Sequence, residues 1–194
     1  MLILNEIFLL EIQNVFYEEK FFQNGVSSEL SENLKRKTIN IYSVNCKAFQ
    51  RYLEYLNVDL AVSFGVGLIK DYIFKTPRHG IINMHRGISE SYRGMESDLW
   101  AIYNRDFENL GVTIHFVDET LDGGQIILQG IFEINKRYSK SELEDITHKI
   151  EHKIYPIAIQ WFAEGLITFD NGEFRFKDKV IESPITYLMK NESL

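Results

Sequence analysis

The sequence has little cysteine and proline, and it lacks any apolar run long enough to cross a membrane. It contains one cysteine, Cys46, and three prolines. One cysteine excludes a disulfide framework within the chain and suits a reducing compartment. We therefore expect a cytoplasmic protein in which Cys46 is a small buried side chain. The apolar residues Met1–Leu4 are interrupted at once by Asn5 and Glu6, which argues against a signal peptide.

Positive charge is scarce as well. The 21 lysines and arginines are outnumbered by 28 aspartates and glutamates, which gives a net charge of −7. A broad nucleic-acid surface needs a basic face, so no nucleic-acid partner is expected. The sequence shows neither a zinc-type cysteine–histidine constellation nor a GxGxxG dinucleotide signature, and we predict no metal site. With 194 residues, of which 45% are hydrophobic, the chain can bury one sizeable core.

Apolar runs of strand length alternate with segments of helical periodicity. This alternation predicts an α/β fold with a largely parallel sheet flanked by helices. The expected strands lie at residues 2–8, 38–44, 59–64, 81–85, 112–117 and 131–135, and the expected helices at 10–22, 46–56, 68–74 and 143–162. Ser141 and Glu144 form a capping-box pattern before the last helix, and Gly165 ends it. The pair Asn171-Gly172 predicts a C-terminal β-hairpin.

Two polar residues stand at a spacing of two in one of these strands. Asn83 and His85 therefore lie on the same face of the sheet. The strand at 112–117 leads into an acidic loop with Asp122, and a carboxylate that bends close to a histidine can orient it as a general base. Ligands bind beyond the carboxyl ends of strands in such sheets, where residues 65–68, 83–86 and 117–122 should meet. The alternative is that these polar residues cap turns or are satisfied locally.

Four motifs in order make this arrangement specific. They are Asn83-x-His85, Tyr92-Arg93-Gly94, Gly111-Val112-Thr113 and Leu121-Asp122-Gly123-Gly124. Together, over residues 58–169, they resemble the formyltransferases that use 10-formyltetrahydrofolate. The resemblance implies a Rossmann-like fold in which Asn83, His85 and Asp122 are catalytic, with 10-formyltetrahydrofolate as the co-substrate and a small amine as the acceptor.

The resemblance also assigns binding residues. The expected co-substrate contacts come from two loops and one strand: Val66, Gly67, Leu68, Ile69, His115, Val117, Asp118 and Leu121. Arg93 and Trp100 are the expected contacts to the amine substrate. Each has an ordinary alternative, because apolar loop residues pack, His115 fits a core histidine, and Arg93 and Trp100 fit a surface ion pair and a core aromatic.

The acceptor amine remains open between several classes. Tyr92-Arg93-Gly94 resembles the tRNA and sugar enzymes, whereas residues 151–156 and 161–165 resemble glycinamide ribonucleotide formyltransferase. The family places three strands and a glycine-bearing phosphate loop before the strand at 59–64. Here we find two strands and no glycine before Gly25, so one N-terminal βα unit is expected to be absent. We favour an amino sugar, with glycinamide ribonucleotide and a non-catalytic folate-binding role as the alternatives.

The expected domain organisation is a catalytic domain at 1–168 followed by a hairpin and tail at 169–194. The tail carries more apolar side chains than a free terminus should expose. We expect it to pack on the same domain or on a second copy, which makes a homodimer one possibility.

Overall fold

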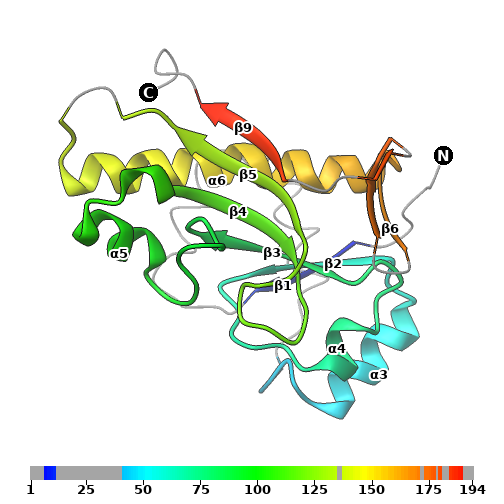
Figure 1. Cartoon of the computed structure of the whole chain (residues 1–194). Coiled ribbons are helices and arrows are strands. Elements are labelled where there is room, and N and C mark those ends of the chain that lie inside the picture. The colour runs from blue at the N-terminus through cyan, green and yellow to red at the C-terminus, as the bar shows by residue number, and fades with distance from the viewer. Residues whose placement is uncertain are drawn as a thin grey trace, which may run out of the picture.

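The computed structural model describes residues 7–11, 41–134, 137–170, 173–177, 179–180 and 184–189. Its centre is a six-stranded sheet in the order β1-β2-β3-β4-β5-β9 (Figure 1). The strands are β1 Ile7–Glu11, β2 Leu60–Phe64, β3 Ile81–Arg86, β4 Gly111–Phe116, β5 Ile126–Phe132 and β9 Ile185–Met189. Because both pairings of β4 are antiparallel and the other three are parallel, only β4 runs against the other five strands. The largely parallel sheet is confirmed.

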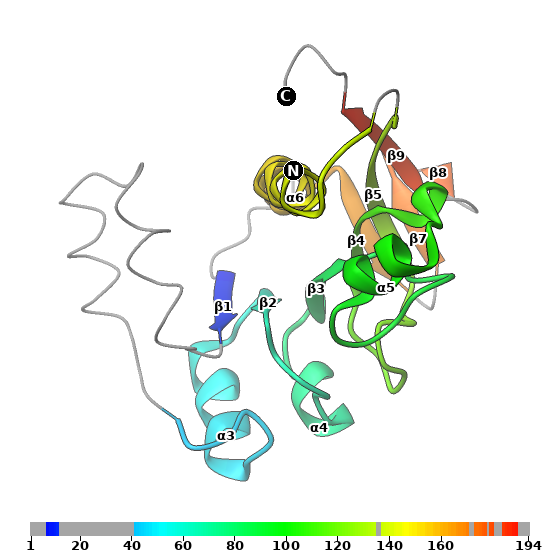
Figure 2. The same cartoon turned by 90° about the vertical axis from the view of Figure 1, so that its left-hand side faces the viewer.

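Helices cover both faces of the sheet (Figure 2). The long helix α6, Lys140–Ala163, lies on one face, and the helices α3, Lys47–Leu56, and α4, Asp71–Phe74, lie on the other. Two further elements, α5 at Ser97–Asn104 and the 3-10 turn η1 at Phe107–Asn109, connect β3 to β4. The expected flanking helices are therefore present, although α4 is shorter than the predicted 68–74.

Alternation along the strands divides the core into two clusters. Leu60, Val62, Ile82 and Ile114 pack in the cluster that includes α6. Ala61 and its neighbours on the opposite face pack with α3 and α4. Successive strand residues point to opposite faces, so this division fixes which face receives the polar residues of the same strands.

The first turn of α6 shows where one prediction was wrong. The capping box is formed by Ser139 and Glu142, not by Ser141 and Glu144. The Glu142 backbone N donates to Ser139 Oγ at 3.3 Å, and the Glu142 carboxylate accepts from the Ser139 backbone N at 2.7 Å. Both serines have a glutamate three residues later, and the earlier box starts a longer helix. Gly165 follows the last turn with φ of 67°, as expected for a residue just beyond a helix.

Several strand boundaries also differ from the predictions. Residues 41–44 form a bend and a turn instead of a strand, and β5 begins at Ile126, five residues before the predicted start. β1 reaches Glu11 and pairs directly with β2. The rest of the predicted helix at 10–22, residues 38–40 of the predicted strand, and the proposed loss of a βα unit concern residues outside those the structure describes.

The C-terminal segment packs against the main sheet and core of the same chain. β6 Ile167–Asp170, β7 Glu173–Phe176 and β8 Lys179–Val180 form an antiparallel sheet, which confirms the predicted hairpin. Phe174 is 2% exposed and packs in the core, with its ring against Phe116 of β4, while β9 pairs with β5. The domain boundary at 168 and the homodimer stay predictions. Among the residues described, no helix is long and apolar enough to cross a membrane.

Candidate functional site

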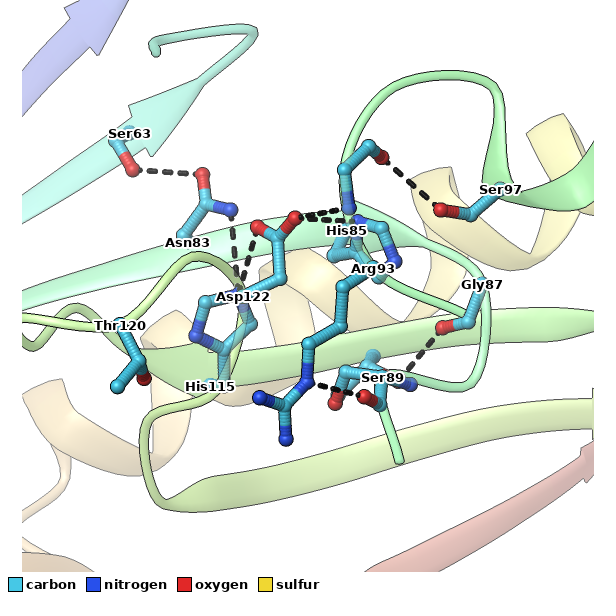
Figure 3. Close-up of polar contacts among 12 residues, drawn as sticks. Ser63, Asn83, His85, Gly87, Ser89, Arg93, Ser97, His115, Thr120 and Asp122 are labelled. Carbon is cyan, nitrogen blue, oxygen red and sulfur yellow. Dashed lines mark hydrogen bonds and ion pairs between the residues drawn. The ribbon is translucent and has the colours of Figure 1, made fainter. Parts of the chain in front are cut away.

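A row of polar side chains crosses three strands on the face opposite α6. Ser63 on β2, Asn83 on β3 and His115 on β4 lie directly across from one another (Figure 3). Ser63 Oγ donates to Asn83 Oδ1 at 2.8 Å, and Asn83 Nδ2 lies 3.3 Å from His115 Nε2. The row exists because these positions alternate with the apolar residues that face α6.

His85 lies two residues beyond Asn83 on the same face, inside β3 and not past its end. Its side chain is buried, with Nε2 2.8 Å from the carbonyl oxygen of Tyr92 and Nδ1 3.4 Å from Asp122 Oδ2. The carbonyl can only accept, so Nε2 carries a proton and the neutral ring keeps its lone pair on Nδ1. Burial lowers the pKa of His85, and the Asp122 carboxylate opposes this shift only in part.

Asp122 reaches the site by a route that the sequence did not predict. Because β4 is antiparallel, its carboxyl end lies beside the start of β3, as the bond from the Val117 backbone N to Ile81 O at 2.8 Å shows. The loop that follows must therefore fold back across the face of the sheet. The Phe116 backbone N donates to Gln125 O at 2.9 Å and closes this loop at its base. Residues 65–68, 83–86 and 117–122 converge as expected. Residues 83–86, however, lie within β3, and residues 117–122 approach from the end of the sheet at which β3 begins.

The Asp122 carboxylate lies between two histidines. Oδ2 accepts from the Gly94 backbone N at 2.8 Å and faces His85, while Oδ1 lies 3.6 Å from His115 Nε2. Burial alone would raise the pKa of Asp122. The Gly94 N–H and the attraction of the carboxylate to the two histidines in their protonated forms outweigh it, so that the pKa of Asp122 lies below its ordinary value and the carboxylate stays ionised.

The residues expected to bind the co-substrate line one pocket beside this cluster. All eight contribute: Val66, Gly67, Leu68, Ile69, His115, Val117, Asp118 and Leu121. Asn83 and Asp122 form part of the same lining, together with Ser63 and Thr120. The pocket thus joins an apolar loop wall to the polar row of the sheet, as expected for a small-molecule site.

Asn45 fixes the loop that forms one wall of this pocket. Its Nδ2 donates to Leu68 O at 2.8 Å, and its Oδ1 accepts from the Lys70 backbone N at 2.7 Å. Tyr72 Oη in turn donates to Asn45 O at 2.6 Å. A side-chain amide therefore pairs with the loop as a neighbouring strand would.

The two residues expected to contact the amine substrate, Arg93 and Trp100, lie outside the pocket lining, and their substrate role stays a prediction. Trp100 is 55% exposed on α5 and makes an edge contact with Tyr103, so it is not a core aromatic. Within the described part of the chain, no group of three or more metal-binding side chains lies together.

Comparison with known proteins decides the family. The formyl transferase family matches residues 20–159, which is most of the chain. The chain belongs to the formyl transferase family. It is 40% identical over 115 residues to a phosphoribosylglycinamide formyltransferase of Haemophilus influenzae, covering 59% of this chain and 54% of that protein. It is 31% identical over 121 residues to a methionyl-tRNA formyltransferase of Thermodesulfovibrio yellowstonii, covering 62% of this chain and 39% of that one. The chain thus spans about half the length of the first relative and less of the second.

Solved structures support the formyl transferase fold. A phosphoribosylglycinamide formyltransferase from Coxiella burnetii superposes with a TM-score of 0.68 at 20% identity, over 93% of this chain and 98% of that one. A likely sugar N-formyltransferase from Mycobacterium tuberculosis gives a TM-score of 0.57 at 20% identity, over 94% of this chain and 74% of that one. At this identity the likeness concerns the fold alone.

In this member of the family, the Tyr92-Arg93-Gly94 motif builds the site mainly through its backbone. The Tyr92 carbonyl accepts from His85, and the Gly94 N–H donates to Asp122. Arg93 Nε donates to Ser89 O at 2.8 Å, and its guanidinium lies against Gly123 (Figure 3). The sequence marked this motif by resemblance only. Backbone groups leave no residue-type signal, and their role here could not have been predicted.

Proposed function

We propose that the chain transfers a formyl group from 10-formyltetrahydrofolate to a primary amine. The observation that carries this proposal is the shared lining of the pocket. Asn83 and Asp122 lie in the same lining as the eight residues expected to contact the folate. A formyl group held there would lie beside a hydrogen-bond donor and a charged proton acceptor, which are the two groups that formyl transfer requires.

The proposed chemistry follows from these positions. The amine nitrogen attacks the formyl carbon, and the negative charge on the formyl oxygen is stabilised by a hydrogen bond from Asn83 Nδ2. The amine proton moves to the pair formed by His85 and Asp122, whose carboxylate stabilises the imidazolium. The bond from carbon to N10 of the folate then breaks, and N10 takes up the proton. His85 lies behind Asp122 and outside the pocket lining, so a water molecule is the fitting carrier between the substrate and its Nδ1.

For the acceptor, we propose phosphoribosylglycinamide over an amino sugar. The Haemophilus relative, at 40% identity, carries this activity in its name. The amino-sugar expectation rested on the Tyr92-Arg93-Gly94 motif. Arg93 packs against Gly123 of the Asp122 loop and lies outside the pocket lining. The Gly94 N–H holds Asp122, so the motif has a structural task that does not depend on an amino-sugar acceptor.

The decisive experiment offers the purified chain 10-formyltetrahydrofolate with phosphoribosylglycinamide, a nucleotide-linked amino sugar or methionyl-tRNA. Formylated product, detected by mass, is expected with the first. Product with the amino sugar alone would reassign the acceptor. A non-reactive folate analogue should also stabilise the fold by about 2.7 kcal/mol at one hundred times Kd. Stabilisation without any product would favour the non-catalytic folate-binding role. If the chain shows neither product nor stabilisation, the proposal is wrong.

The pH dependence of the reaction tests the role of His85. The neutral imidazole is the base, and burial lowers its pKa below the ordinary 6.5. A lowered pKa keeps the ring neutral to lower pH, so kcat/KM should fall on the acid side with a midpoint below 6.5. The measurement is kcat/KM across the pH range at constant ionic strength. A midpoint above 6.5 would contradict this assignment of the base.

A further inference from the structure

The polar row contains a hydroxyl that the reaction itself does not use. Ser63 is fully buried on β2, and its Oγ has two acceptors within reach. These are Asn83 Oδ1 at 2.8 Å and the carbonyl oxygen of Ile82 at 3.2 Å. A serine hydroxyl has one proton. The acceptor that receives it therefore decides whether the Asn83 amide is held in place.

The orientation of that amide follows from its other neighbour. The Phe116 carbonyl oxygen can only accept, and it lies 2.8 Å from His115 Nδ1, so Nδ1 carries the proton. In the neutral ring Nε2 is then an acceptor, and the Asn83 atom 3.3 Å away must be Nδ2. Oδ1 consequently faces Ser63. Turning the amide by half a rotation would point Nδ2 at Ser63 and away from His115 (Figure 3).

A second hydroxyl reaches the same place from α6, through the sheet. Tyr155 Oη lies 2.6 Å from Ser63 O and 3.1 Å from Ile82 O. Burial raises the pKa of Tyr155, so its hydroxyl is a donor at any physiological pH. The tyrosine hydroxyl has one proton, and the shorter distance makes the Ser63 carbonyl oxygen its acceptor, so Tyr155 holds the backbone of Ser63. For the Ser63 hydroxyl, Asn83 Oδ1 at 2.8 Å is likewise nearer than the Ile82 carbonyl oxygen at 3.2 Å.

We propose that Ser63 and Tyr155 are positioning residues that hold the Asn83 amide with Nδ2 toward the reacting formyl group. Ser63 acts by a direct hydrogen bond, and Tyr155 acts by holding the backbone of Ser63 through its carbonyl oxygen. The kinetic consequence rests on the proposed function, since formyl transfer needs Nδ2 to be presented. The order of the hydrogen bonds does not depend on that function and can be measured separately.

The kinetic test is a double-mutant cycle. Ser63→Ala and Tyr155→Phe should each lower kcat about threefold to tenfold, the range expected from one neutral hydrogen bond, with KM for the folate changed less than about twofold. The double variant should be no slower than Ser63→Ala, because Tyr155 acts through Ser63. Multiplicative effects in the double variant would overturn the role of Tyr155. Thr147→Val is the matched control, since it removes an equally buried hydroxyl that donates to Leu143 O on α6.

Nitrogen NMR supplies a readout that does not need activity. In the wild type, His115 should show a proton on Nδ1, and the side-chain amide protons of Asn83 should exchange slowly. Exchange should become about threefold to tenfold faster in Ser63→Ala and Tyr155→Phe and stay unchanged in Thr147→Val. Unchanged exchange in Ser63→Ala would overturn the proposal, even if Tyr155→Phe fails to fold. If Asn83 amide exchange becomes faster in these two variants but the wild-type chain formylates no amine, the proposed function is wrong and the positioning of Asn83 still stands.

Discussion

Asp122→Asn should lower kcat by roughly 10²–10⁴ and leave the fold and folate binding nearly intact. The side chains are nearly the same size, and the amide oxygen can still accept from the Gly94 N–H at the place of Oδ2. The charge that stabilises protonated His85 is lost. Steady-state kinetics measure the first effect, and thermal shift with a non-reactive folate analogue measures the second.

The Asp122→Asn variant should also shift the pH dependence of kcat/KM in a defined direction. Asp122 raises the pKa of His85 against the effect of burial, so removing its charge lowers that pKa further. The acid limb of kcat/KM should therefore move to lower pH as the rate falls. Asp145→Asn, an exposed carboxylate on α6, is the control and should leave both unchanged. Near-normal turnover in Asp122→Asn would end the catalytic assignment of the carboxylate.

The positions of several strands, and the face of the sheet on which their side chains lie, could be predicted from the sequence. The apolar run at 59–64 predicted a buried strand, and β2 occupies residues 60–64 of it. The spacing of Asn83 and His85 placed both side chains on one face, as the structure has them. These predictions succeed because the strand period is a local property of the backbone.

The direction of β4 could not be predicted in this way. β3, α5 and β4 follow one another as strand, helix and strand, which usually gives a parallel pair. The structure pairs β3 and β4 antiparallel, in a register that sets Asn83 opposite His115. Direction and register depend on where the connecting segment packs, which is a tertiary property. The path of the loop to Asp122 follows from the antiparallel direction of β4, so it could not be predicted from local sequence either.

Ser63 shows a second limit of sequence reasoning. Within its apolar run it looks like a tolerated small residue, and nothing local marks it as a donor to Asn83. Its partner is twenty residues away on the next strand. Tyr155 likewise lies within the predicted helix at 143–162 with nothing local to mark it, and the structure places its hydroxyl against two strand carbonyls. Polar contacts between distant elements appear only when the packing is known.

Gly124→Ala should cost both turnover and folate binding, in contrast to Asp122→Asn. A Cβ at Gly124 would lie 1.9 Å from the Phe116 carbonyl oxygen, and this backbone atom cannot move aside without opening the loop. The bond from the Phe116 N to Gln125 O closes that loop at its base. The whole segment that carries Val117 and Asp122 should therefore shift. We expect kcat to fall at least about 10²-fold, as when a positioned acid–base group is lost, and overpacking to cost about 1–3 kcal/mol of unfolding free energy.

The neighbouring glycine provides the matched control for this prediction. A Cβ at Gly123 would meet Thr120 Oγ1 and Arg93 Nη1, which are ends of side chains that can rotate away. Gly123→Ala should therefore keep most of the folate binding. If the Gly124→Ala loop moves as expected, Kd for a folate analogue rises at least tenfold. The stabilisation at one hundred times the wild-type Kd then drops from about 2.7 to about 1.4 kcal/mol. Equal folate binding by the two variants would show that the closed loop base does not form the pocket, and the assignment of residues 117–121 to the co-substrate would have to be withdrawn.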